Sequence, residues 1–159
     1  MKFLTTALVA VGFAVGTLPA KANLAATYLM NSPVLDAVKS TDALVLIDSP
    51  ACRKDGLLGV YEVGPKYGNH LHICLARHHN DMRELQDTVK HEAIHVAQYC
   101  RNSVLLNPSL VAKEATSSDF SNLANYASSQ RAIELEARVL ARKLSEEQVA
   151  DVVMRHCRK

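Results

Sequence analysis

The sequence lacks the clustered basic residues of nucleic-acid-binding proteins and, beyond its N-terminal segment, the long apolar runs of membrane-spanning proteins. Its basic residues are spread along the chain and gather only in the C-terminal tail, residues 155–159. A nucleic-acid site needs clustered Lys and Arg and a positive domain charge, so we expect no nucleic-acid partner. Beyond the first twenty-odd residues, no apolar run approaches the roughly 20 residues of a transmembrane helix. We therefore expect no membrane span once the N-terminal segment has been removed.

That N-terminal segment has the three parts of a secretory signal peptide. A short start with Lys2 is followed by an almost wholly apolar stretch, residues 7–18, and by an A-x-A cleavage pattern at residues 20–22. We expect cleavage after Ala22, a secreted or periplasmic location, and one domain at residues 23–159. Losing the two lysines of this segment takes the basic residues from 18 to 16, equal to the 16 acidic ones.

The sequence also lacks any Cys-x-x-Cys pair, the spacing that a cysteine-ligated zinc site usually needs. An even number of cysteines in an exported chain instead indicates disulfides. The four candidates are Cys52, Cys74, Cys100 and Cys157. Three pairings are possible and the sequence does not choose between them. A disulfide at Cys100 would hold the end of the helix described next.

Residues 81–101 contain neither Gly nor Pro and predict one long helix with a packed apolar side. It carries His91-Glu92-Ala93-Ile94-His95, the H-E-x-x-H motif of zinc hydrolases. Residues four apart on a helix share a face, with Cβ atoms about 5–6 Å apart, so both imidazoles can reach one ion. Glu92 stands beside them, where the motif places the general base that acts on a metal-bound water.

A catalytic zinc usually takes three protein ligands and keeps its fourth position for water. In metzincins the third ligand is a histidine six residues after the second, but here that position is Arg101. A second predicted helix, residues 131–144, offers Glu134 and Glu136 instead. Two residues apart on a helix point to different sides, so at most one of them is expected to reach the metal. The periodicity does not decide which.

The remaining segments predict an α+β fold. Residues 23–40 predict helix, with a start or kink at Pro33, and residues 145–156 predict a last helix that begins at an N-cap serine. Residues 102–130 are rich in Ser and Asn and predict short capped helices. Strands are predicted at residues 43–47, 60–63 and 70–75, the first of them buried.

Three polar residues outside the motif have two interpretations each. His70 and His72 share one face of the strand at residues 70–75, where His72 could bind the metal, or both could cover a half-exposed edge strand. We favour the second, because the helix already supplies two ligands. Such an edge strand beside the metal helix could pair with an extended peptide. Tyr126 could donate a hydrogen bond to an oxyanion in the site, or serve as a half-buried core tyrosine.

Residues 70–98, followed by Glu134-Leu135-Glu136-Ala137-Arg138-Val139-Leu140-Ala141, resemble the ImmA/IrrE-type zinc metallopeptidases. In that family a strand precedes the H-E-x-x-H helix, and a helix with an E-x-E-A-N-x-F-A-like pattern follows. The resemblance covers roughly half of the mature chain. It implies a small zincin-like domain with a short sheet, an edge strand beside the H-E-x-x-H helix and a C-terminal helical part. It also implies Zn²⁺ as cofactor and Glu134 as third ligand, although Arg138 stands where Asn or Asp is usual.

The sequence thus predicts an exported zinc metallopeptidase of the H-E-x-x-H…E (gluzincin) type, acting on a peptide or protein. Two alternatives stay open. One is a non-catalytic exported binding domain with a structural zinc, and the other is a cell-wall-active zinc amidase. The sequence names neither the substrate nor the oligomeric state.

Overall fold

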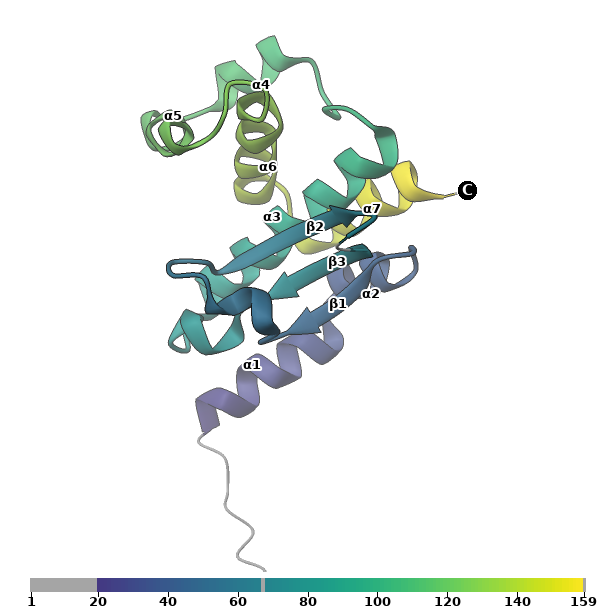
Figure 1. The fold of residues 1–159 in the computed structure, drawn as a ribbon, viewed down its shortest axis with the longest axis vertical. Coiled ribbons are helices and arrows are strands. Elements are labelled where there is room, and N and C mark those ends of the chain that lie inside the picture. The colour runs from purple at the N-terminus through teal and green to yellow at the C-terminus, as the bar shows by residue number, and fades with distance from the viewer. Residues whose placement is uncertain (1–19, 67, 159) are drawn as a thin grey trace, which may run out of the picture.

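A computed structural model of the protein describes residues 20–66 and 68–158, with seven α-helices and a three-stranded sheet in this part of the chain (Figure 1). The predicted α+β class is confirmed. The helices are α1 (Ala20–Asn31), α2 (Pro33–Lys39), α3 (Met82–Arg101), α4 (Pro108–Glu114), α5 (Ser117–Asn122), α6 (Arg131–Lys143) and α7 (Glu146–Cys157). The strands are β1 (Leu44–Ile47), β2 (Gly59–Gly64) and β3 (Gly68–Ile73).

The predicted signal peptide lies outside the described residues, apart from its last three, which open α1. In the described part of the chain, no helix combines the length and the apolar character needed to cross a bilayer.

Side-chain caps fix where the predicted helices begin. The carboxylate of Asp81 accepts a hydrogen bond from the backbone of Glu84 at the start of α3. Ser145 and Gln148 form a reciprocal capping box at the start of α7. Each cap satisfies a backbone N–H that the first helical turn leaves without an acceptor. The predicted boundaries of both helices are confirmed.

The order of strands in the sheet corrects two predictions. The order is β1-β3-β2, with β1 parallel and β2 antiparallel to β3, so β3 is the central strand rather than an edge. Nor is β1 buried, because Leu44 and Ile47 remain 59% and 41% exposed. Both errors came from equating polar with exposed and apolar with buried. His72, on the polar face of β3, is only 5% exposed, and it is β2 that forms the edge strand beside α3.

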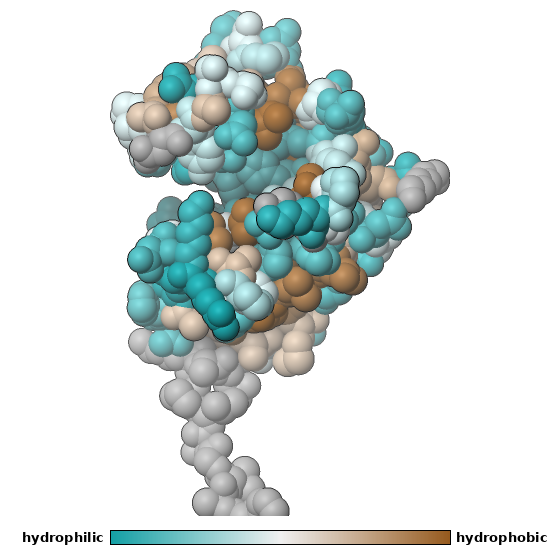
Figure 2. Space-filling model, in the orientation of Figure 1, coloured by the Kyte–Doolittle hydropathy of each residue, from teal (hydrophilic) through white to brown (hydrophobic). Residues whose placement is uncertain are grey.

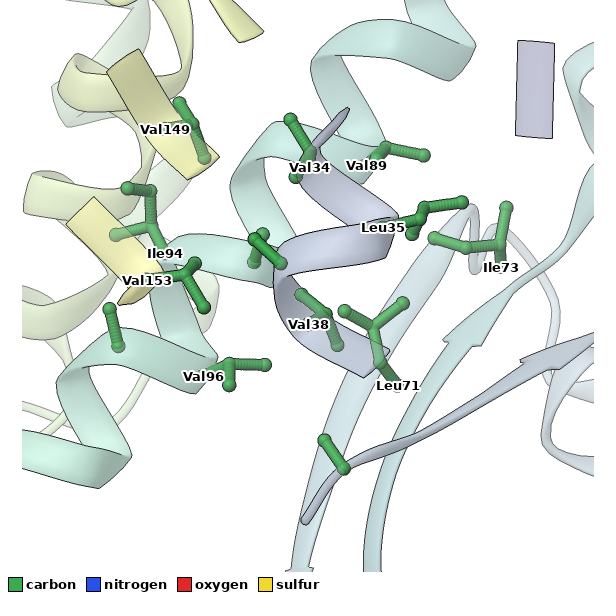
Figure 3. Close-up of a cluster of buried hydrophobic side chains, with 14 of the residues drawn as sticks. Val34, Leu35, Val38, Leu71, Ile73, Val89, Ile94, Val96, Val149 and Val153 are labelled. Carbon is green, nitrogen blue, oxygen red and sulfur yellow. The ribbon is translucent and has the colours of Figure 1, made fainter. Parts of the chain in front are cut away.

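The main core lies between the sheet, α2, α3 and α7 (Figure 3). The short helix α2 is its centre: Val34, Leu35 and Val38 are almost completely buried between the strands and α7. From β3, Leu71 and Ile73 point into the same core, and α3 contributes the apolar side that its periodicity predicts. This packing holds α3 rigidly against the sheet, which matters because α3 carries the H-E-x-x-H motif.

A smaller apolar cluster holds the second part of the molecule together. It joins α4, α6 and the turn after α5 through Val111, Leu123, Leu135 and Val139. In Figure 1 this part lies above the sheet, and α6 packs against α3. One face of α6 therefore belongs to the smaller cluster and another face meets the H-E-x-x-H helix.

Two disulfides are present, as expected from the even number of cysteines. Cys52 pairs with Cys74, and Cys100 pairs with Cys157. The second disulfide links the last turn of α3 to the last turn of α7, so the helix with the H-E-x-x-H motif is held at the end that Cys100 was expected to hold. Disulfides of this kind persist in oxidising compartments.

Candidate metal centre

The two motif histidines and one glutamate converge where α3 meets α6. His91 and His95 lie one turn apart on α3, with their Nε2 atoms 3.1 Å from each other. Glu134, in the first turn of α6, places Oε2 3.5 Å from His91 Nε2 and Oε1 3.5 Å from His95 Nε2. These donor atoms all lie within 4.8 Å of one another and form a group that could hold a metal ion.

The spacing of the donor atoms fits a tetrahedral ion. Zn²⁺ binds imidazole nitrogen and carboxylate oxygen at about 2.0–2.2 Å, which separates two ligands of a tetrahedron by roughly 3.4 Å. The closest approaches between the side chains, 3.1, 3.5 and 3.5 Å, lie near this value. The two approaches to Glu134 are made by its two different oxygens, and with one donor atom from each residue all separations stay within 4.8 Å. Glu134 Oε2 is also buried without a hydrogen-bond partner. A buried carboxylate oxygen normally has a partner, and a cation between the three side chains would supply one.

Gln98 holds the ring of His95 in the orientation that a metal ligand needs. Its Oε1 lies 2.7 Å from His95 Nδ1. When Nδ1 carries the proton and donates it to this oxygen, Nε2 is left with a free lone pair that faces His91 and Glu134. The Gln98 amide nitrogen donates in turn to the backbone oxygen of Ile133 and to Glu136 Oε2, which fixes which way the amide points.

Glu136, the other candidate third ligand, faces away from the metal group. It is fully buried, and its carboxylate accepts hydrogen bonds from the backbone N–H groups of Leu105 and Leu106 as well as from Gln98. The two glutamates thus point to different sides of α6, as their spacing predicts. Glu136 ties the loop after α3 to α6, and through Gln98 it supports His95.

Glu92 lies at the base of the group, against the first residue of β2. A Cβ atom added to Gly59 would lie 2.7 Å from Thr88 Cγ2 and 3.0 Å from Glu92 Cγ. Only a glycine therefore lets the edge strand approach α3 so closely. This contact helps to bury Glu92, and burial raises the pKa of its carboxyl to about 7, against the lowering influence of the nearby His91.

Burial keeps His95 in the neutral form that a metal ligand needs. Burial lowers the pKa of His95 to about 4, and the neighbouring His91 contributes to the same shift. The imidazole is therefore neutral at physiological pH, as a metal ligand must be. Burial alone would raise the pKa of Glu134, but the proximity of His91 and His95 outweighs burial and lowers it. Glu134 is therefore ionised and available to a cation.

A groove leads to this group from solvent. It has a volume of about 620 Å³ and runs between the residues that precede β2, one side of α3, and the helices α5 and α6. His91 and Glu92 line it from α3, Arg138 lines it from α6, and Tyr126 lines it from the turn that precedes α6. Figure 2 shows the molecule hollowed between the part that contains α4, α5 and α6 and the part that contains the sheet. The volume lies in the range of ligand-binding pockets.

A family model for a domain of unknown function, DUF8637, matches residues 24–158. The chain belongs to this family. No curated protein and no solved structure matches it. The function of this DUF8637 domain is therefore inferred from the site itself.

The sequence offered His72 and Tyr126 as further site residues, and the structure places only Tyr126 near the group of donors. His72 does not join it: its Nδ1 lies 2.6 Å from Ser49 Oγ and its Nε2 lies 3.4 Å from Glu62 Oε2, on the opposite face of the sheet from α3. The alternative in which His72 completes the metal site is therefore wrong for this structure. Tyr126 is half-buried but lines the groove beside His91, so its position is compatible with a role in the site.

Sequence reasoning gave no role to Gln98, Gly59 or Arg138 in the site. Gln98 follows His95 by three residues, so both lie on the same side of α3. This spacing could have predicted the contact between the two side chains. Gly59 was visible only as one of several turn glycines. Arg138 was visible only as a departure from a family pattern, and its place in the groove depends on how α6 packs against α3.

Proposed function

We propose that this DUF8637 domain is an exported zinc-dependent metallopeptidase, similar in its site to the ImmA/IrrE-type enzymes. The observation that carries the proposal is the convergence of His91, His95 and Glu134 at separations close to those of a tetrahedral zinc site. The three described donors match the ligand number of catalytic zinc sites, whereas structural sites usually have four protein ligands. Two disulfides support a location in an oxidising compartment.

A bound Zn²⁺ would supply a Lewis acid that polarises a peptide carbonyl and makes a water molecule more acidic. The imidazoles of His91 and His95 and the carboxylate of Glu134 would hold it. Gln98 keeps His95 Nε2 directed at the group by accepting the hydrogen of Nδ1. Glu136 in turn keeps Gln98 in place.

Glu92 carries the proton. Its carboxyl lies next to His91 without belonging to the group of donors, and burial raises its pKa to about 7 in the metal-free protein. A buried carboxyl in this position can both accept a proton from water and release it again. Glu92 takes a proton from the attacking water while the water oxygen bonds to the peptide carbonyl carbon. The C–N bond then breaks, and Glu92 passes the proton to the leaving amine. One water is consumed, and a carboxylic acid and an amine are formed.

The edge strand β2 favours a peptide as substrate. It borders the groove at Gly59, and one of its two sides is not paired within the sheet. An extended peptide can add to such a side by main-chain hydrogen bonds and present its backbone carbonyls to a neighbouring site. The free side of β2 therefore favours a peptidase over the alternative of a cell-wall amidase.

The test is a pair of measurements on purified protein that begins at Asn23. Metal analysis should find about one zinc per chain, and a broad peptide library followed by mass spectrometry should reveal cleavage that a chelator abolishes. Glu92→Gln should retain its zinc and lose turnover by about 100-fold or more, because the proton carrier is gone. Asp151→Asn, which removes an exposed carboxylate from α7, is the control and should cleave normally. Zinc without cleavage of any peptide would favour the non-catalytic binding domain, and cleavage of cell-wall fragments alone would favour the amidase.

A further inference from the structure

Arg138 places a positive charge beside the metal group, where it helps to lower the pKa of Glu134 and of Glu92 without forming a close ion pair with either carboxylate. None of the ion pairs within 4.0 Å in the described part of the chain involves Arg138. Its Nε is buried without a hydrogen-bond partner. Its guanidinium carbon lies 6.0 Å from the centre of the Tyr126 ring, and both side chains line the groove. Besides its hydrogen bond with Tyr126, the guanidinium has donors available for a ligand that enters the groove.

The neighbouring arginine on α6 shows the contrast. Arg142, one turn further along α6, also lines the groove, but its Nη2 lies 3.0 Å from Asp119 Oδ2 and 2.9 Å from the backbone oxygen of Glu114. Its charge is therefore neutralised by Asp119, and its Nη2 already donates to acceptors of the protein. Arg138 makes no such close ion pair, and a half-buried arginine without one loses hydration that is only partly replaced. An anion that enters the groove would supply the missing partner.

The position of Arg138 suggests what the anion is. Arg138 follows Glu134 by four residues of α6, or about 6 Å along the helix axis. One extended residue of a peptide spans at most about 3.6 Å. An anion bound to Arg138 therefore lies within one or two residues of a carbonyl placed at the metal group. A guanidinium matches a planar carboxylate with two parallel hydrogen bonds, and the terminal carboxylate is the anion that a peptide carries whatever its sequence.

We propose that Arg138 binds the C-terminal carboxylate of the substrate, with Tyr126 against its guanidinium, so that the enzyme removes one or two residues from C-terminal ends. This inference rests on the proposed metallopeptidase function and names its substrate class. It makes Arg138 a specificity-determining residue, because a peptide without a free carboxylate leaves the guanidinium without its partner.

The test measures binding rather than turnover, in the zinc-loaded Glu92→Gln protein, which holds a peptide without cleaving it. The probes are one mixture of N-acetylated tripeptides made with a free C-terminal carboxylate and the same mixture made as C-terminal amides. Calorimetry should give at least roughly tenfold tighter binding of the acids, the size expected for a charge-assisted pair of hydrogen bonds. Introducing Arg138→Gln into the Glu92→Gln protein should abolish this preference for peptides with a free carboxylate. Arg138→Lys keeps the charge but loses the planar fork, so it should reduce the preference and provides a second variant if the first does not fold.

Arg83→Gln is the matched control, because Arg83 lines the same groove more than two turns of α3 before His91. The preference for acids should survive this change. Equal binding or no measurable binding of both probe mixtures would overturn the inference. So would a preference that persists without Arg138, since the carboxylate would then be held by the metal, or one that disappears equally in Arg83→Gln, since overall charge would then explain it.

The outcomes also separate this inference from the proposed function. Cleavage of peptides by the wild-type protein, combined with no effect of Arg138 on acid and amide binding, would leave the metallopeptidase standing and remove its carboxylate site. If the protein holds zinc and cleaves nothing, but prefers acid over amide peptides only when Arg138 is present, the carboxylate site would stand and the metallopeptidase function would be removed.

Discussion

Replacing Glu92 with Gln should change how the stability of the metal-free protein depends on pH. Burial raises the pKa of Glu92 from 4.5 to about 7. Between these two values the folded protein keeps the proton on Glu92 while the unfolded chain has lost it, so the folded state binds more protons and its stability falls as pH rises. At 1.36 kcal/mol for each pKa unit, the contribution of Glu92 should decrease by about 3 kcal/mol across this window.

His95 acts in the opposite direction over nearly the same range. Burial lowers its pKa from 6.5 to about 4, so between these values the unfolded chain binds more protons and stability rises with pH. In the wild-type protein the two contributions largely cancel. Glu92→Gln removes one of them, so the stability of the variant should rise from about pH 4 to pH 6.5, by an amount on the order of 3 kcal/mol from His95.

The measurement is urea unfolding of both proteins, with chelator present and disulfides intact, followed by circular dichroism at steps from pH 4 to pH 8. The quantity of interest is the free energy of unfolding of the wild type minus that of Glu92→Gln, because groups common to both cancel. This difference should fall as pH rises from 4.5 to 7. Asp151→Asn is the control: it also removes one negative charge, but from an exposed position on α7. A flat or rising difference for Glu92→Gln, or an equal slope for Asp151→Asn, would refute the argument that burial sets the pKa of Glu92.

Three further predictions concern the metal ligand, the close approach of β2 and the second disulfide. Glu134→Gln should weaken zinc binding by more than ~100-fold in a competition with a chromogenic chelator, since changes outside the ligand shell already cost 10–100-fold; unchanged affinity would exclude Glu134 as a ligand. Gly59→Ala should lower the free energy of unfolding by about 1–3 kcal/mol, because the added Cβ meets Thr88 and Glu92, and wild-type stability in urea would show that the contact relaxes freely. Replacing Cys100 and Cys157 with Ser should cost about 4 kcal/mol, the loop entropy for residues 57 apart in sequence; a loss below 1 kcal/mol would mean that the unfolded chain gains little freedom.

The helix that carries the motif was predictable because its information is local. An uninterrupted run of helix-compatible residues, an aspartate that caps it and a regular apolar side fix α3 almost to the residue, and the four-residue step then brings His91 and His95 to one face. The sheet was less predictable. A strand has the same alternating sequence pattern whether its polar face meets water or other side chains. Only the structure shows that β3 is the central strand and that His72 is buried.

The sequence by itself determined the pair of histidines, the glutamate between them and the helix that presents them, because residues four apart on a helix must share a face. Only the tertiary structure decided that Glu134 rather than Glu136 completes the group, that Gln98 orients His95, and that Arg138 enters the groove. These depend on the angle and rotation at which α6 packs on α3, which are set by the apolar contacts of the whole core rather than by the spacing of residues along either helix.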